Sequence, residues 1–295
     1  MKHLGDMTDP KVAALYAGVP SNDMQKFQAF CNANPYQQVT IHGVEWSYLS
    51  MQESGEPILL LSGVLAIPDI SWNSIAHFAE RYHVIAPVYP AVKTMEALVD
   101  GIAEILRREG IQQAHVLGGS YGGFVAQVFV RRYPEMTRSL VLSHTLPPDP
   151  ANGEKISKAM GWLRLLPEGV LRWLMGKRLG SLMPVETGGM AMLHAMFNEL
   201  LYHRLTKADV LSIFWRTVDY CALEFTPQDL AGWPGKVLLV LADDDPGTSE
   251  AVRLELGDLY PQAGVHLFHG TGHVTSILKQ DEYQAVIGEF LRGQP

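Results

Sequence analysis

The stretch AHVLGGSYGGFVAQVFVRRYP, residues 114–134, contains the pattern Gly118-x-Ser120-x-Gly122. An apolar run typical of a strand precedes the pattern, and an amphipathic run typical of a helix follows it. A sharp strand-to-helix turn presents its central side chain at the edge of a sheet and leaves no room for side chains at the flanking positions. The pattern therefore predicts a nucleophile elbow with Ser120 as the nucleophile.

Two other interpretations of this stretch have to be compared with the elbow. A glycine-rich turn can simply pack a helix against a strand. A dinucleotide-binding loop would need its second glycine where Ser120 stands, and the stretch lies in the middle of the chain. Both interpretations fit the strand–turn–helix context less well than the elbow does.

A serine hydroxyl is a weak nucleophile and needs a base, which in this type of site comes late in the chain. His273 lies in the glycine-rich segment VHLFHGTGHVTSIL, after the last strand-like run, and His269 is a rival. Gly270 and Gly272 prevent a helix from aligning the two rings, and no glutamate adjoins them. A metal site is therefore not expected, and neither is a cofactor.

The acid should come from the segment KVLLVLADDDPGT, in which a strand-like run ends at Asp243, Asp244 and Asp245. A buried carboxylate that accepts the histidine N–H fixes the tautomer of the ring and stabilises the imidazolium ion. Asp245, which precedes a proline, is the first candidate, and Asp244 is the second.

Acyl transfer also needs two N–H groups that bind the oxyanion. Tyr121, which follows the nucleophile, is expected to supply one of them. Val64, in the segment SGVLAIP after the strand-like run at 58–61, is expected to supply the other. The alternative for this segment is an ordinary turn at the end of a strand.

The elements that must position these residues alternate along the chain, which predicts an α/β fold with a mostly parallel, doubly wound sheet. Continuous apolar runs typical of buried strands lie at 58–61, 83–88, 114–118, 139–143, 236–242 and 265–268. Helical periodicity lies between several of them, at 72–81, 94–109, 121–132 and 249–259, and follows the last one at 281–292. Two alternating runs within 39–50 predict antiparallel strands that turn at Gly43, and residues 10–33 predict a short helical extension.

Residues 144–235 carry no strand signal and predict helices at 154–166, 168–178, 188–204 and 208–223. A parallel crossover needs only a dozen or so residues, so the excess predicts an inserted helical cap over 146–224, with a core over 1–145 and 225–295. The insertion holds six of the twelve methionines, namely Met160, Met175, Met183, Met190, Met192 and Met196. Met192, Met196 and Trp162, with Leu65 of the core, are candidate substrate contacts; the alternative is that such residues only pack the cap.

The composition excludes several classes of partner. With 31 acidic and 23 basic residues the net charge is −8, which argues against nucleic acid and against anionic membrane surfaces. The N-terminal segment has no apolar stretch of the signal-peptide type, and no uncharged run approaches the length of a membrane span. The two cysteines, Cys31 and Cys221, suggest buried thiols. We therefore expect a cytoplasmic protein that binds a small-molecule substrate, as a monomer or a homodimer.

The order Ser120, Asp245, His273, together with the segments GGSYGG, SLVLSHTLPPDP, ADDDP and GTGH, resembles the α/β-hydrolase superfamily over residues 39–292. The branch it resembles acts on small molecules and carries a cap after the sixth strand. The N-terminal extension and the LYPQA segment at 259–263 also resemble maspardin-like proteins.

Two positions depart from the family's pattern: Ser62-Gly63 stands where the family usually has His-Gly, and Ala242 stands where it usually has glycine. A serine at position 120 argues against dehalogenases and epoxide hydrolases, which resemble this fold but use an aspartate nucleophile.

The resemblance implies hydrolysis of an ester, lactone or thioester bond in a small, lipophilic substrate. The alternatives are a C–C hydrolase, a lyase or a cyclising acyltransferase with the same triad, and a non-catalytic binding module on a hydrolase scaffold.

Overall fold

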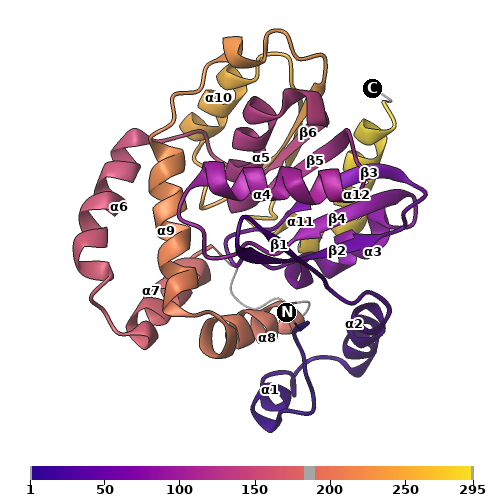
Figure 1. The fold of residues 1–295 in the computed structure, drawn as a ribbon, viewed down its shortest axis with the longest axis vertical. Coiled ribbons are helices and arrows are strands. Elements are labelled where there is room, and N and C mark those ends of the chain that lie inside the picture. Colours follow the sequence, from indigo (N-terminus) through magenta and orange to yellow (C-terminus); the bar gives the residue numbers. More distant parts are fainter. Residues whose placement is uncertain (1, 183–189, 294–295) are drawn as a thin grey trace.

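An eight-stranded sheet forms the centre of the protein in its computed structural model, which describes residues 2–182 and 190–293 (Figure 1). The strand order is β1-β2-β4-β3-β5-β6-β7-β8. The strand β2 is antiparallel to both of its neighbours, and all other neighbouring pairs are parallel. The strands span Gln37–Ile41 (β1), Val44–Met51 (β2), Glu56–Leu61 (β3), Tyr82–Pro87 (β4), Ala114–Gly119 (β5), Thr137–Ser143 (β6), Lys236–Ala242 (β7) and Gly264–Phe268 (β8). The predicted fold class, a mostly parallel α/β sheet, is confirmed.

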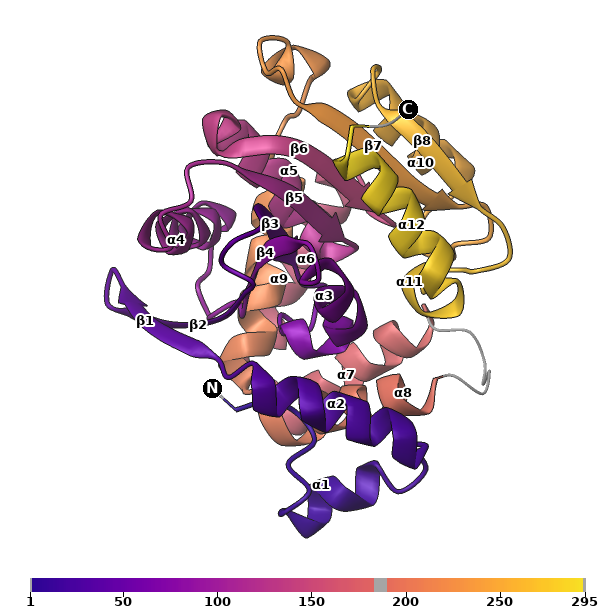
Figure 2. The same ribbon diagram turned by 90° about the vertical axis from the view of Figure 1, so that its right-hand side faces the viewer.

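Helices cover both faces of this sheet, which is why its central strands are apolar throughout rather than alternating. The helices α4 and α5 lie on one face, and α3 and α12 lie on the other (Figure 2). The core helices span Trp72–Phe78 (α3), Met95–Arg108 (α4), Tyr121–Arg132 (α5), Glu250–Leu259 (α10), Thr275–Leu278 (α11) and Gln280–Leu291 (α12).

The register of the parallel strands determines which residues meet at the carboxyl edge of the sheet. Gly119 at the end of β5 pairs with Ser143 at the end of β6, and Ser143 pairs with Val240 of β7. Ala242 of β7 pairs with Phe268 of β8. The loops that follow β5, β6, β7 and β8 therefore leave the sheet side by side, and they carry the candidate site.

The segment between β6 and β7 is helical, and in Figure 1 it extends from one side of the sheet to below it. Its elements are α6 (Pro150–Leu163), α7 (Glu168–Gly180), α8 (Ala191–Glu199), the π-turn η3 (Leu200–Arg204) and α9 (Lys207–Cys221). The helix predicted at 188–204 is thus a shorter α-helix that continues into a π-turn. In this turn the N–H of Leu205 donates to the carbonyl of Leu200 at 2.9 Å, which is a five-residue spacing.

The predicted N-terminal extension consists of two helices, α1 (Pro10–Leu15) and α2 (Ser21–Ala33). The carboxylate of Asp9 caps α1 by accepting the N–H of Lys11. Two aromatic rings of α2, Phe27 and Phe30, pack on Trp72 of α3 with ring centroids 5.6 and 5.9 Å apart. The extension therefore packs against the core.

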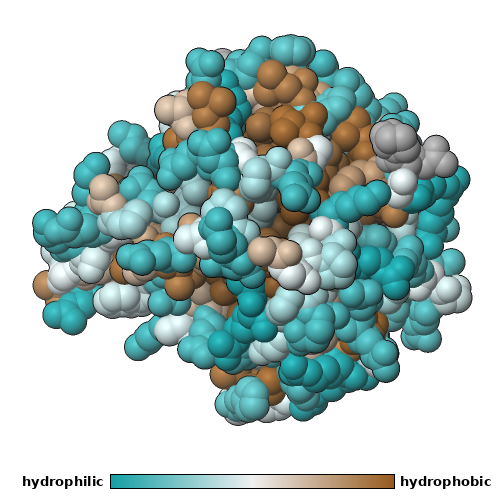
Figure 3. All heavy atoms as spheres, turned by 90° about the horizontal axis from the view of Figure 1, so that it is seen from above, coloured by the Kyte–Doolittle hydropathy of each residue, from teal (hydrophilic) through white to brown (hydrophobic). Residues whose placement is uncertain are grey.

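Apolar side chains also reach the surface, as the view from above shows (Figure 3). The edge strand β8 exposes Val265 and Leu267, and α10 exposes Leu254. Within 2–182 and 190–293, none of the helices has the length and apolar character needed to cross a bilayer.

Candidate active site

Ser120 stands at the turn between β5 and α5, with a backbone φ of +53° and ψ of −122°. A residue other than glycine rarely adopts this backbone conformation, and such strain is found at functional sites. The flanking glycines are required by space. A Cβ at Gly118 would lie 2.2 Å from the carbonyl oxygen of Gly122, and one at Gly122 would lie 2.2 Å from that of Leu61. The predicted sharp turn with crowded flanks is what the chain forms.

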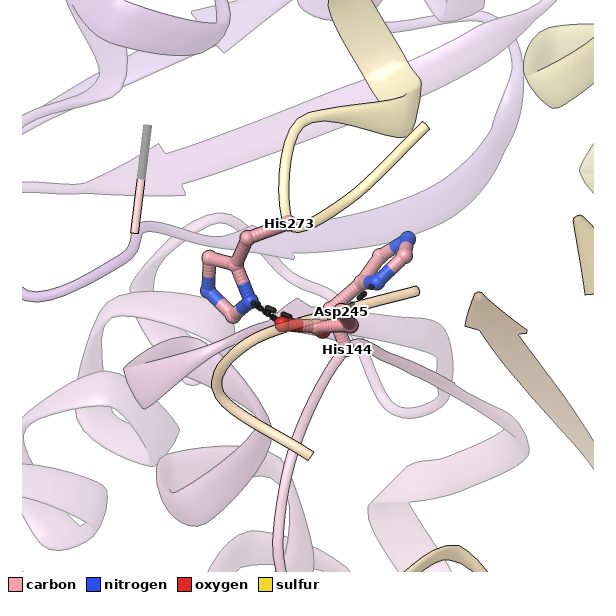
Figure 4. Close-up of side chains that lie close together, drawn as sticks. All are labelled: His144, Asp245 and His273. Atoms are coloured by element: carbon pink, nitrogen blue, oxygen red, sulfur yellow. Dashed lines mark hydrogen bonds and ion pairs between the residues drawn. The ribbon is translucent and has the colours of Figure 1, made fainter. Parts of the chain in front are cut away.

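The imidazole of His273 lies between Ser120 and Asp245 and contacts both. Its Nε2 is 2.9 Å from the Oγ of Ser120. Its Nδ1 is 2.9 and 3.0 Å from the two carboxylate oxygens of Asp245, as Figure 4 shows. An ionised carboxylate only accepts hydrogen bonds, so Nδ1 carries the hydrogen and Nε2 is free to accept the serine proton. These three residues form one continuous chain of hydrogen bonds.

Each of the three consecutive aspartates has a different partner. Asp243 accepts a hydrogen bond from the exposed ring of His269 at 2.6 Å. Asp244 accepts the N–H groups of two residues of the glycine-rich loop, at 3.1 and 3.0 Å, and so holds the loop that carries His273. Only Asp245 is completely buried and faces His273. The rival histidine, His269, therefore lies on the outer side of this loop.

The charge of Asp245 is stabilised within the protein. Burial raises the pKa of this carboxyl, but hydrogen bonds from His144 and His273 and one from the N–H of Gly247 outweigh burial and hold its pKa well below the usual range. The N–H of Gly247 lies 2.7 Å from Oδ1. Asp245 is thus an anion at neutral pH.

His144 is the residue that the sequence analysis missed. It directly follows β6, and its Nδ1 lies 3.1 Å from Oδ2 of Asp245. A signal was available, because a histidine at the end of a predicted buried strand, SLVLSH, lies at the same sheet edge as the elbow.

The atoms of His144, Asp245 and His273 that could bind a metal lie within 4.8 Å of one another. Two histidines and a carboxylate are a ligand set that zinc accepts. Binding an ion at these atoms would remove the hydrogens that now join both rings to Asp245. The hydrogen-bonded arrangement therefore competes with a metal at this position.

A cavity of about 200 Å³ opens onto Ser120 and His273. Its lining is mostly apolar and comes from both parts of the chain. The core contributes the loop that contains Val64 and Leu65, and the helical insertion contributes Leu179, Leu193 and Phe197. An apolar group attached to the reacting carbonyl would fit here.

The predicted substrate contacts are placed unevenly around this cavity. Leu65 lines it, but Trp162, Met192 and Met196 are not among the described residues that do. Trp162 is half exposed, and Met196 is buried elsewhere in the cap. The reason is helical geometry: Leu193 and Phe197, four residues apart, share the face of α8 that is turned to the cavity.

The other cap methionines that the structure describes are buried as well. Met160, Met175 and Met190 have at most 5% of their surface exposed, which fits packing of the helices between β6 and β7. Met183 lies outside the described residues.

The two predicted oxyanion donors lie where the elbow meets the first loop. Val64 lines the cavity, and Tyr121 opens helix α5 directly after Ser120. Among the hydrogen bonds of the described residues, none is donated by the backbone N–H of Val64 or of Tyr121. The phenol of Tyr121 points elsewhere and accepts a hydrogen bond from Nε of Arg216 at 2.9 Å.

Part of the chain is similar to curated proteins. Human epoxide hydrolase 4 is 25% identical over 121 residues, which are 36% of this chain and 33% of that protein. The chain matches only between 33% and 40% of the length of its curated relatives.

Solved structures match over most of the chain. An esterase from Thermogutta terrifontis has a TM-score of 0.72 at 20% identity, covering 87% of this chain and 98% of that one. A meta-cleavage product hydrolase from Pseudomonas fluorescens has a TM-score of 0.67 at 22% identity, covering 87% and 97%. Likeness at this level of identity concerns the fold. The model of the alpha/beta hydrolase family matches residues 58–288, most of the chain, and the protein therefore belongs to the alpha/beta hydrolase family.

Proposed function

We propose that the protein is a serine hydrolase that cleaves an ester-like bond in a small, lipophilic substrate. The observation that carries this proposal is the hydrogen-bonded chain from Ser120 through His273 to Asp245, placed at the floor of an apolar cavity. A serine on a strained turn, a base at 2.9 Å and a buried anion behind the base are the parts that acyl transfer requires.

In the first half of the proposed reaction, Nε2 of His273 takes the proton of Ser120 while Oγ attacks the carbonyl carbon. The backbone N–H groups of Tyr121 and Val64 bind the oxyanion, which is supported by their lack of other acceptors among the described residues. The imidazolium ion is stabilised by Asp245 and gives its proton to the leaving oxygen or sulfur. The products are an acyl-serine and a free alcohol or thiol.

In the second half, His273 removes a proton from water, and the resulting hydroxide attacks the acyl-serine. The oxyanion forms again at the same two N–H groups. Its collapse releases the carboxylic acid and returns the proton to Ser120. Every proton in this cycle passes through His273, and water is the second reactant.

The character of the cavity supports the substrate class. Leu65, Leu193 and Phe197 surround the approach to Ser120, and a space of about 200 Å³ suits a short acyl or aromatic group rather than a polymer. The similar esterase from Thermogutta terrifontis agrees with this class.

The similar meta-cleavage product hydrolase favours a second candidate, hydrolysis of a carbon–carbon bond. Epoxide opening, suggested by the name of the human relative, is a weaker candidate. The position expected to hold an aspartate nucleophile in that class is occupied here by Ser120.

The test is the hydrolysis of p-nitrophenyl esters from acetate to octanoate, with a meta-cleavage product as an alternative substrate. We expect the wild type to hydrolyse the esters and Ser120→Ala to lose on the order of 10³-fold or more in kcat. Ser276→Ala is the matched control, because Ser276 also lines the cavity and is not part of the hydrogen-bonded chain. Turnover of the meta-cleavage product alone would favour the second candidate, and equal activity of Ser120→Ala and wild type would refute both.

A further inference from the structure

His144 and His273 approach the carboxylate of Asp245 from different sides (Figure 4). Their ring centroids are 5.7 Å apart, and the planes of the rings are inclined by 68°. The side chain of His144 is 5% exposed and that of Asp245 is completely buried. A Ser-His-Asp triad needs only one histidine at its aspartate, so the second histidine calls for an explanation.

The hydrogens between these groups can be assigned from the acceptor. Because an ionised carboxylate only accepts, the Nδ1 atoms of His144 and His273 are both donors to Asp245. Oδ2 of Asp245 accepts hydrogen bonds from the rings of His144 and His273, at 3.1 and 2.9 Å. Oδ1 also accepts a hydrogen bond from the N–H of Gly247. No described residue bonds to the buried Nε2 of His144. Within the described chain, Asp245 is thus the hydrogen-bond partner that orients this ring.

The backbone of His144 is held in a conformation that residues with a Cβ seldom adopt. Its φ is +49°, in the left-handed region. Its N–H donates to the carbonyl of Val240 at 2.9 Å, which continues the pairing of β6 with β7 by one residue and fixes this turn. Strained backbone in a buried histidine next to a catalytic constellation is typical of a functional constraint rather than of filling space.

We propose that His144 is a positioning residue for the triad: its Nδ1–H holds the carboxylate of Asp245 in the orientation that receives His273 and shares the negative charge of that carboxylate. The inference rests on the proposed function, since it concerns the same site. His144 also lines the cavity, but its printed side-chain hydrogen bond goes to Asp245 and not to Ser120, so it acts through Asp245.

Because His144 shares the charge of Asp245, its removal should shift the pH dependence of activity in a defined direction. A carboxylate that already accepts a second imidazole N–H attracts the proton of His273 less strongly. Without His144, the carboxylate of Asp245 has one hydrogen-bond donor fewer and stabilises the imidazolium form of His273 more strongly. The acid limb of the activity profile should then move to higher pH.

The other titratable groups near this cluster do not obscure that limb. Tyr283 of α12 lines the same cavity, and burial raises the pKa of its phenol, which stays neutral. Asp244 is held by the glycine-rich loop, and Asp243 pairs with the exposed His269. These groups are the same in the variants compared below, so a shift between variants reports the removed N–H.

The experiment compares wild type with His144→Leu and His144→Asn. An asparagine amide nitrogen can take the place of Nδ1, and asparagine tolerates the left-handed region, so this variant restores the donor. The readout is the second-order rate at which a small fluorophosphonate labels Ser120, followed by intact-protein mass from acid to neutral pH. This rate reports the activated serine without knowledge of the substrate, and thermal unfolding of each variant checks its fold.

We expect His144→Leu to label about tenfold more slowly at the plateau, with its acid limb displaced upward by about half a pH unit to one unit. His144→Asn should recover most of both. Wild-type labelling and an unshifted profile in His144→Leu would overturn the inference, as would equal impairment of the two variants.

An NMR measurement tests the same contact without any turnover and without relying on the leucine variant. With histidine labelled in its ring nitrogens, the wild type should show a downfield Nδ1–H signal from His144 as well as one from His273, and His144→Asn should lose only the first. Absence of the His144 signal in wild type would overturn the inference. If the His144 signal is present but the fluorophosphonate does not react with Ser120 in the wild type, the proposed function is contradicted instead.

Discussion

Two completely buried carboxylates, one in the core and one in the helical insertion, are surrounded by different kinds of partner. Asp245, in the loop after β7, accepts hydrogen bonds from two imidazoles and one backbone N–H. Glu199, at the end of α8, accepts the N–H of Gly5 at 2.7 Å and the hydroxyl of Tyr16 at 2.9 Å, and it pairs with Arg204. Both carboxylates are fully satisfied, as buried charges must be.

The difference between them lies in what their partners do next. His273 contacts Asp245 with one nitrogen and the hydroxyl of Ser120 with the other, so Asp245 orients a base that reaches a nucleophile. Within the described residues, the partners of Glu199 are not bonded to a nucleophile; they join residues of the N-terminal segment to α8. A buried carboxylate is therefore a site only when the group it orients reaches a reactive atom.

A third buried carboxylate, Asp69, extends the structural network to the rim of the cavity. It lies in the 3-10 turn η1 (Pro68–Ser71) and accepts the N–H of Leu4 and the hydroxyl of Tyr36, both at 2.6 Å. The N-terminal segment thus joins a core turn to a cap helix, and both of these elements contribute residues to the cavity. We infer that this network sets the shape of the cavity while Asp245 serves the chemistry.

The largest effect should come from Asp245→Asn. The amide is the same size, but its nitrogen cannot accept from His273, and the ring then favours the wrong tautomer. We expect kcat on an ester to fall on the order of 10⁴-fold while the fold persists. Asp243→Asn, at the exposed neighbour, is the control and should keep full activity. Comparable losses in the two variants would erase the distinction between these aspartates.

Glu199→Gln should have the opposite signature. It removes the charge that pairs with the partly exposed Arg204 and leaves buried donors with a weaker acceptor, so the free energy of unfolding should fall by about 3 kcal/mol. Urea denaturation measures this loss, and Glu154→Gln, on an exposed part of the cap, is the control. The labelling rate of Ser120 in the folded protein should change little. A loss of labelling without a loss of stability would place Glu199 among the catalytic groups.

A smaller effect is expected at the wall of the cavity. Phe197→Ala should alter kcat/KM for long-chain esters relative to acetate by about tenfold, because an apolar contact with the acyl chain is lost. Trp162→Ala removes an aromatic residue of the same insertion that lies away from the cavity and should leave this ratio unchanged. If Trp162→Ala changed this ratio more than Phe197→Ala did, Trp162 would be the substrate contact instead.

The smallest effect concerns acid stability. The pKa of Asp245 is lowered in the folded protein, so its ionisation stabilises the fold above the unfolded pKa of about 4, and this contribution is lost as the pH falls toward the folded pKa. The stability gap between wild type and Asp245→Asn should therefore narrow as the pH falls below about 4. Denaturant unfolding at a series of pH values measures the gap, and a gap independent of pH would contradict the assigned charge.

The sequence predicted the sheet well because each buried strand is a short, unbroken apolar run and each crossover helix has clear periodicity. The elbow was predictable for a similar reason: Ser120 and its glycines are local in the chain. The sequence narrowed the acid of the triad to three consecutive aspartates, and only the turn after β7 decides which of them faces His273.

Other features depend on contacts between distant parts of the chain. His144 meets Asp245 across 101 positions, and Glu199 meets Gly5 across 194. The cavity wall was only partly predictable, because the rotation of α8 about its axis, which turns Phe197 and not Met196 toward the cavity, is fixed by tertiary packing.

The most direct test of the account is the intact mass of the wild-type protein after reaction with a small fluorophosphonate, followed by peptide mapping. The account predicts one adduct per chain, located on Ser120, and no adduct in Ser120→Ala or His273→Ala. An unmodified wild-type protein, or an adduct that persists in Ser120→Ala, would contradict the claim that Ser120 is an activated nucleophile.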